Sequence, residues 1–121
     1  MSQAVQPAVI AIVGPTASGK SALALRVAQA VDAEIVSTDS MQAYRGMNIG
    51  TAKPSEVDQR LVRHHMIDVW PVDLAVSVVE FRDMARQAID DVRGRGKTAL
   101  VVGGSGLYVR AVLEKLDFPG T

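Results

Sequence analysis

The chain has 121 residues, 48% of them apolar, which is enough for one domain with a buried core. Its 13 Lys and Arg residues balance 13 Asp and Glu residues, and this neutrality argues against binding nucleic acid through bulk electrostatics alone, although a shaped RNA site stays open. The chain has no cysteine, no secretory signal near its start and no apolar run of the ~20 residues that span a bilayer. We therefore expect a soluble cytoplasmic protein that makes no disulfides, thiolate metal sites or membrane contacts.

The first part of the chain predicts two strands with a helix between them. Residues 8–13 (AVIAIV) form a short, continuous apolar run, which is typical of a buried strand, and residues 33–37 (AEIVS) predict a second one. The helix between them covers residues 21–31 and turns Arg26 and Gln29 outward. The apolar side chains that its spacing places on the buried face are Leu23, Val27, Ala30 and Val31.

The next segment reads as a long loop followed by short elements. Residues 39–54 have little periodicity, and loops of this length in compact domains are often functional. Ser55 is a suitable N-cap for a short helix over residues 55–64. Residues 65–69 (HMIDV) suggest a brief strand.

The clearest amphipathic pattern covers residues 77–92, where Ser77 and Glu80 predict a capping box at the start of a helix. A buried strand over residues 98–102 (TALVV) and a last helix over residues 107–116 follow. Apolar strands that alternate with helices predict parallel β/α units, with helices covering a sheet. The chain stops directly after a helix, so we expect residues 1–121 to be one partial α/β catalytic core, truncated from something longer.

Residues 14–21 (GPTASGKS) match G-x-x-x-x-G-K-[ST], the pattern of a phosphate-binding loop. Its glycines let successive backbone N–H groups point at phosphate oxygens, and the following helix adds its positive end. Lys20 brings a charge to the terminal phosphate, and the Ser21 hydroxyl can hold a Mg²⁺ ion that bridges phosphates. The fold class is therefore P-loop NTPase-like. The predicted diphosphate- or nucleotide-binding residues are Gly14, Pro15, Thr16, Ala17, Ser18, Gly19, Lys20 and Ser21.

An ATPase or GTPase would add an acid at the end of an apolar strand, to hold the metal. The strand TALVV ends in Gly103 and Gly104 instead, and Asp68 has only a short apolar lead-in. Asp39 follows the strand AEIVS and is the acid best placed beside bound phosphate, because parallel strands share their carboxyl edge. It could hold Mg²⁺ through water, act as a general base, or simply be a solvated helix cap.

Four segments, GPTASGKS, DSMQAYRGMNIGTAKP, HHMID and VVGGSGLYVRAVL, resemble in order and spacing the tRNA dimethylallyltransferases, also called tRNA isopentenyltransferases, of the bacterial MiaA type. The resemblance runs from about residue 9 to about residue 116. It implies transfer of a dimethylallyl group from dimethylallyl diphosphate to N6 of the adenosine on the 3′ side of the tRNA anticodon, with release of diphosphate. It also implies that residues 16–21 contact the prenyl donor rather than ATP, with Lys20, Ser21 and Mg²⁺ at the leaving diphosphate.

The resemblance also assigns the substrate side of the site. It implies that Asp39 is the general base on the adenine amino group. Ser40, Met41 and Gln42 fall in the segment that grips the flipped-out adenine, and Ser105 touches the tRNA. The expected partners are dimethylallyl diphosphate and a tRNA anticodon stem-loop, and we expect a monomer.

Three positions depart from the residues usual in this family: Asn48 stands for Asp, Val76 for Tyr and Ser105 for Thr. Members of the family are more than twice as long, and the helical insertion that embraces tRNA and a later arginine at the diphosphate are absent from residues 1–121. Two alternatives to an active prenyltransferase therefore stay open. One is a P-loop small-molecule kinase with ATP in the loop, and the other is an inactive fragment that only binds diphosphate.

Several other side chains need an interpretation. His64 and His65 suggest a metal site, but adjacent residues point apart and the chain has no other His and no Cys, so we expect a structural or surface role. Trp70 and Tyr108 are expected to pack, whereas Tyr44, inside the specific motif, is open between packing and base stacking.

We expect most charged side chains to face solvent rather than to bind RNA. Residues 82–95 mix both signs along one helix, which is more typical of an exposed face than of an RNA-binding patch. Better candidates for phosphate contacts are Arg45, Lys53 and Arg110.

Overall fold

The computed structural model describes residues 8–14, 19–38, 54–71, 77–104 and 106–113. Within them a four-stranded, all-parallel sheet has the strand order β1-β4-β2-β3, which confirms the predicted parallel α/β fold. The strands are β1 (Val9–Val13), β2 (Ala33–Ser37), β3 (His64–His65) and β4 (Thr98–Gly103). The helices are α1 (Lys20–Val31), α2 (Glu56–Leu61), α3 (Val78–Gly94) and α4 (Gly106–Leu113).

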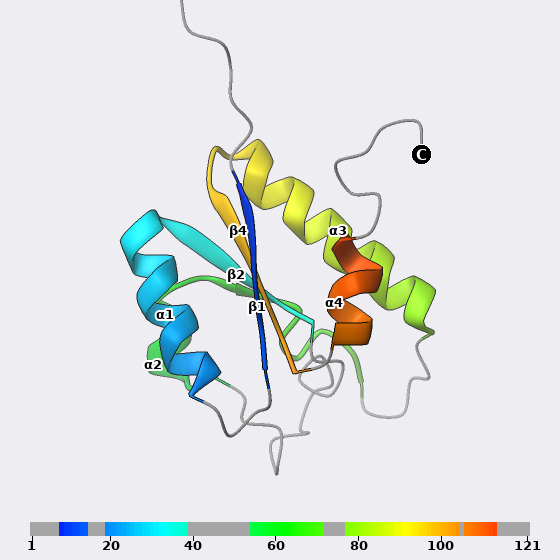
Figure 1. The fold of residues 1–121 in the computed structure, drawn as a ribbon, viewed down its shortest axis with the longest axis horizontal. Coiled ribbons are helices and arrows are strands. Elements are labelled where there is room, and N and C mark those ends of the chain that lie inside the picture. Colours follow the sequence, from blue (N-terminus) through cyan, green and yellow to red (C-terminus); the bar gives the residue numbers. More distant parts are fainter. Residues whose placement is uncertain (1–7, 15–18, 39–53, 72–76, 105, 114–121) are drawn as a thin grey trace, which may run out of the picture.

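The helices cover the sheet in two layers (Figure 1), with α1 and α2 on one face and α3 and α4 on the other. Successive side chains of a strand point to opposite faces, so the central strands supply both cores. Ile35 and Leu100 belong to the core under α1, and Val36 and Val101 to the core under α3 and α4. No helix in the described part of the chain is long and apolar enough to cross a membrane.

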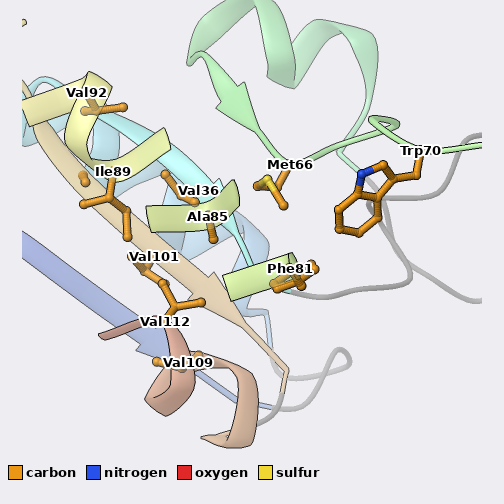
Figure 2. Close-up of a cluster of buried hydrophobic side chains, with 11 residues drawn as sticks. Val36, Met66, Trp70, Phe81, Ala85, Ile89, Val92, Val101, Val109 and Val112 are labelled. Atoms are coloured by element: carbon orange, nitrogen blue, oxygen red, sulfur yellow. The ribbon is translucent and has the colours of Figure 1, made fainter. Parts of the chain in front are cut away.

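The core under α3 and α4 is the larger one (Figure 2). One stripe of α3 enters it through four side chains spaced three or four residues apart, namely Phe81, Ala85, Ile89 and Val92. The rings of Trp70 and Phe81 meet edge to face with their centroids 5.8 Å apart, so Trp70 packs as predicted.

The helix starts follow the capping predictions. The Ser55 side chain accepts a hydrogen bond from the backbone N–H of Asp58 at 3.1 Å, which fixes the start of α2. Ser77 and Glu80 form the predicted capping box of α3, with side-chain hydrogen bonds of 3.1 and 3.3 Å. The helix α3 ends at Gly94, and Gly96 follows with a φ of 82°, a conformation that favours glycine.

The predicted buried face of α1 is correct at Val27, which packs against the core under α1, and wrong at the other three positions. Leu23 and Val31 are 51% and 44% exposed, and Ala30 is exposed as well. The residues that face the sheet are Ala24 and Ala28, which are 2% and 1% exposed. Because these two small side chains lie one turn apart, they let the helix lie close against the strands, whereas larger side chains would hold it away.

Three element predictions also need correction. The strand expected at residues 65–69 ends at His65, because Met66 and Asp68 adopt φ values of 70° and 54° that a strand does not tolerate. The helix expected over residues 55–64 ends at Leu61. The strand β1 is an edge strand in the described sheet, and none of its five apolar residues is fully buried. The end of the last predicted helix, residues 114–116, lies outside the described residues.

A buried ion pair ties β2 to the end of α3. Glu34, which is 4% exposed, accepts hydrogen bonds from two guanidinium nitrogens of Arg95 at 2.5 and 2.8 Å. His65 Nε2 lies 2.7 Å from the same carboxylate, and Arg95 also binds Asp91 at 2.8 Å. The Arg95 hydrogen bonds lower the pKa of Glu34 from 4.5 to about 2, against the opposing effect of burial, and His65 adds to the lowering.

The first prediction concerns how this ion pair responds to acidic pH. Because folding lowers the pKa of Glu34, its contribution to stability is complete above the unfolded value of 4.5 and is lost as the pH falls toward about 2. We therefore expect the free energy of unfolding of Glu34→Gln to depend less on pH than that of the wild type across this range. Urea unfolding followed by circular dichroism measures both. Asp83→Asn, at a carboxylate with 59% side-chain exposure, is the control; equal pH dependence in Glu34→Gln and wild type would contradict the prediction.

The second prediction concerns Gly103, the last residue of β4. A methyl group there would collide with Thr38 Oγ1 and a methyl of Val109, and both of these residues are buried. We expect Gly103→Ala to lower the free energy of unfolding by about 1–3 kcal/mol, as overpacking does. The matched control is Gly94→Ala in α3, where an added methyl has no neighbour within 4 Å and the change should be neutral or stabilising. If denaturant unfolding ranked the two variants in the opposite order, the packing argument would be wrong.

Candidate functional site

Three strands end at the same edge of the sheet, and backbone hydrogen bonds hold the residues that follow them. The N–H of Gly14 donates to the carbonyl of Gly103 at 3.1 Å. The N–H and the hydroxyl of Thr38 both donate to the carbonyl of Val102, at 2.8 and 3.2 Å. The chain exits of β1 and β2 are therefore fixed beside the end of β4, the edge at which open α/β sheets bind ligands.

The helix α1 starts at this edge. Gly19 precedes it with a φ of 79°, a left-handed conformation that glycine adopts without steric cost. Among the described residues no side chain caps the helix, and its first turn contains no acidic residue. The first N–H groups of a helix lack partners inside the helix and carry a partial positive charge. This end of α1 is therefore suited to bind an anion.

Lys20 folds back over the strand ends. The residue is only 8% exposed although it carries a charge. A Cβ placed on Gly104 would lie 3.5 Å from Lys20 Nζ and 3.8 Å from the carbonyl oxygen of Gly14, so the amine lies over the glycines at the sheet edge. Ser21, the next residue, is exposed on the first turn of α1. The amine of Lys20 and the hydroxyl of Ser21 thus lie on the first turn of α1, at the carboxyl edge of the sheet.

A pocket opens beside Lys20 and Ser21, on the α1 face of the sheet. The cavity itself has a volume of about 40 Å³ and opens to solvent. Its apolar lining residues are Ala24, Leu25, Ile35, Pro54 and Val102. Its polar lining includes Asp58 of α2, His64 of β3 and Ser37 at the end of β2.

Burial lowers the pKa of His64 below its ordinary value of 6.5, and the hydrogen bond to the Val62 carbonyl and the nearby Asp58 carboxylate only partly oppose this effect. Nδ1 of the ring lies 2.7 Å from the carbonyl oxygen of Val62, so Nδ1 carries a proton and donates this hydrogen bond. In the neutral ring, Nε2 keeps its lone pair and can accept a hydrogen bond.

The histidine prediction needs refining. A structural role is confirmed for His65, which contacts Glu34, whereas His64 lines the pocket. No group of three or more His, Asp or Glu side chains that could hold a metal forms among the described residues. Sequence reasoning did not select Asp58 and rejected His64 as a metal ligand, although HHMID contains His64 and the predicted N-cap Ser55 precedes the helix that contains Asp58.

The described ranges contain part of the predicted site. They bring Gly14, Gly19, Lys20 and Ser21 together at one edge. Arg110 is exposed on α4, and Asp68 is exposed after β3. The remaining predicted site residues lie outside the described residues; they are Pro15, Thr16, Ala17, Ser18, Asp39, Ser40, Met41, Gln42 and Ser105, and the same holds for Tyr44, Arg45 and Lys53.

Comparison with known sequences relates the chain to one enzyme family. The tRNA dimethylallyltransferase of Salinispora arenicola is 58% identical to it over 113 residues, and that of Acidothermus cellulolyticus is 55% identical over 113 residues. Each match covers 93% of this chain, and they cover 33% and 36% of the two relatives. The chain thus spans about a third of the length of these curated relatives.

Solved structures of similar fold relate the chain to the same family. The tRNA Δ(2)-isopentenylpyrophosphate transferase of Staphylococcus epidermidis matches with a TM-score of 0.83 and 46% identity, over 89% of this chain and 36% of that one. The full-length tRNA isopentenylpyrophosphate transferase of Bacillus halodurans matches with a TM-score of 0.85 and 42% identity. The match covers 93% of this chain and 37% of that one. The predicted fold class is therefore confirmed. The sequence pattern of the IPP transferases matches residues 42–121, and the chain belongs to that family.

Proposed function

We propose that the chain forms the donor-binding part of a tRNA dimethylallyltransferase. The reaction moves a dimethylallyl group from dimethylallyl diphosphate to N6 of the adenosine on the 3′ side of the anticodon and releases diphosphate. The observation that carries the proposal is the buried amine of Lys20 at the N-terminus of α1, a helix end that no described side chain caps. The relatives named above, which are tRNA dimethylallyltransferases, support the choice of substrate.

The carboxyl edge of the sheet, where Gly14, Gly103 and Lys20 lie, would stabilise the leaving diphosphate, and we call it the phosphate edge. Allylic diphosphates ionise readily once the charge that develops on the departing diphosphate is balanced. The first N–H groups of α1 point out of the helix at its N-terminus, and Lys20 adds a full positive charge next to them. Because these groups are fixed before the donor arrives, they need no rearrangement as the bond breaks.

A Mg²⁺ ion fits the first turn of α1. Mg²⁺ prefers oxygen ligands and keeps several waters, so one exposed hydroxyl beside the phosphates is a suitable protein ligand. Ser21 offers this hydroxyl directly after Lys20. When bound, the ion would supply further positive charge to the diphosphate oxygens.

Asp39 is proposed as the general base, with Ser40, Met41, Gln42 and Ser105 on the tRNA side. Asp39 directly follows Thr38, whose two hydrogen bonds to Val102 fix the chain at the phosphate edge. The exocyclic amine of adenine is a weak nucleophile, because its lone pair is delocalised into the ring. Removing a proton as the C–N bond forms therefore lowers the barrier. The adenine must leave its stack to reach the site, which costs a few kcal/mol.

The competing function is phosphoryl transfer from ATP. A phosphate loop would accept either ligand, but β4 ends at Gly103 and Gly104, where an ATPase or GTPase could have an acid to hold the metal. This difference favours the prenyl donor.

The proposal is tested by comparing ligands. Isothermal titration calorimetry with Mg²⁺ should show tighter binding of dimethylallyl diphosphate than of ATP. Transfer of a labelled prenyl group to an anticodon stem-loop should fall by about a hundredfold or more in Asp39→Asn, the size expected for loss of a general base, while donor binding stays within about twofold. Tighter binding of ATP, or transfer that does not depend on Asp39, would reject the proposal.

A further prediction concerns Lys20. Lys20→Met removes one charge-assisted contact, which is worth about 1.5–3 kcal/mol, so we expect inorganic diphosphate to bind about 10- to 100-fold more weakly. The matched control is Lys97→Met, because Lys97 precedes β4 at the opposite edge of the sheet, where it pairs with Asp32 at 3.2 Å. Calorimetry should give wild-type affinity for the control. Equal losses in both variants would show that Lys20 contributes only to the net charge.

A further inference from the structure

We propose that Thr38 is a positioning residue for the prenyl transfer, because its buried hydroxyl fixes the chain exit of β2 against the end of β4. Asp39, the base in the proposed function, is the next residue along the chain, so this inference rests on that function. It assigns a role to a side chain that lies outside the motif GPTASGKS.

Thr38 is a buried polar residue directly after β2. It is 1% exposed, and its N–H and its hydroxyl both donate to the carbonyl of Val102, at 2.8 and 3.2 Å. The N–H alone would already satisfy this buried acceptor. Valine has nearly the same shape and no hydroxyl to bury, so burial alone would not favour threonine here. The second hydrogen bond instead fixes the direction in which the chain leaves β2.

The hydroxyl also occupies the side-chain space of Gly103. A Cβ placed on Gly103 would collide with Thr38 Oγ1 and would lie 3.5 Å from Thr38 Cβ. The carbonyl of Gly103 accepts the hydrogen bond from the N–H of Gly14 at 3.1 Å. Two successive carbonyls of β4 therefore hold the exits of β2 and β1. Thr38 bonds to the first of them and packs against the glycine that carries the second.

A methyl group cannot replace this hydroxyl without moving the chain. Non-bonded carbon atoms pack best at about 3.5–4.0 Å, whereas Thr38 Oγ1 lies 3.2 Å from the carbonyl oxygen of Val102. A methyl group at this point would therefore push Thr38 away from the end of β4. Successive Cα atoms are about 3.8 Å apart, so a shift of Thr38 is passed on to residue 39.

This displacement should affect the base rather than the diphosphate. A misplacement of about 1 Å can slow an aligned reaction by about a hundredfold. The groups proposed to bind diphosphate, Lys20 and the first N–H groups of α1, belong to another segment. The hydrogen bond from Gly14 to Gly103 does not involve Thr38. Loss of the hydroxyl should therefore lower kcat and leave donor binding unchanged.

The test compares Thr38→Val with Thr38→Ser, which removes the methyl group but keeps the hydroxyl. In prenyl transfer to an anticodon stem-loop, we expect Thr38→Val to lower kcat by about tenfold, with KM for dimethylallyl diphosphate within about twofold. Thr38→Ser should recover most of the rate. A loss in Thr38→Ser as large as that in Thr38→Val would overturn the inference.

Ile89→Val is the matched control, because it also alters one fully buried side chain, but on α3. A purely structural role of Thr38 would change stability in both variants and kcat in neither. Equal kcat in Thr38→Val and Ile89→Val would therefore contradict the positioning role.

A second measurement needs no prenyl transfer. Mn²⁺ bound with inorganic diphosphate broadens the NMR signals of nearby amides, and the effect falls steeply with distance. We expect equal broadening of the Asp39 amide in wild type and Thr38→Ser. It should be weaker in Thr38→Val, because the exit of β2 moves away from the phosphate edge. Unchanged broadening in Thr38→Val would overturn the inference, whether or not the chain transfers a prenyl group.

The wild type separates the two proposals. If it binds neither dimethylallyl diphosphate nor inorganic diphosphate, the proposed function fails, and this inference fails with it. If it binds both, and Thr38→Val keeps the wild-type kcat and the wild-type broadening, only the role of Thr38 fails.

Discussion

The end of β4 is the constraint on which the site depends. Its last carbonyls, on Val102 and Gly103, accept the hydrogen bonds that hold Thr38 and Gly14 in place. A side chain at Gly103 would displace Thr38, and the amine of Lys20 lies within van der Waals contact of Gly104. The sequence VVGG therefore does two things, because it completes a buried strand and then leaves space for a cation over the strand ends. The start of α1 and the exit of β2 take their positions from this edge.

The two edges of the sheet have different roles. At the carboxyl edge the contacts are mostly backbone hydrogen bonds and small residues, which leaves room for a ligand. At the amino edge Glu34, His65, Arg95 and Asp91 form a network that joins β2, β3 and the end of α3. The large core under α3 and α4 lies between these edges. The amino edge is thus held together by charged side chains, whereas the described part of the carboxyl edge is held by backbone hydrogen bonds and close packing.

Local patterns predicted most elements, because apolar runs, caps and glycines act over a few residues. The capping box at Ser77, the N-cap at Ser55 and the strands at residues 33–37 and 98–102 are of this kind. Most of the buried face of α1 was predicted wrongly, since hydrophobicity favours Leu23 whereas close packing on a sheet favours Ala24. The turn at Gly19 and the start of α1 were predictable from the motif GPTASGKS. The pocket was not, because Leu25, Asp58 and Val102 meet only after the strands are ordered as β1-β4-β2-β3.

The strand β1 has a consequence for how the polypeptide behaves in isolation. Its sequence, VIAIV, contains no charge and no proline, Val13 is 49% exposed, and within the described residues it pairs with β4 alone. Natural proteins usually guard such a border with lysines, prolines or bulges, because its unpaired amides and carbonyls are a template for intermolecular β-pairing. Among the described residues nothing covers this border, so we expect a charged substitution such as Ala11→Lys to lower any tendency of the chain to pair with other copies.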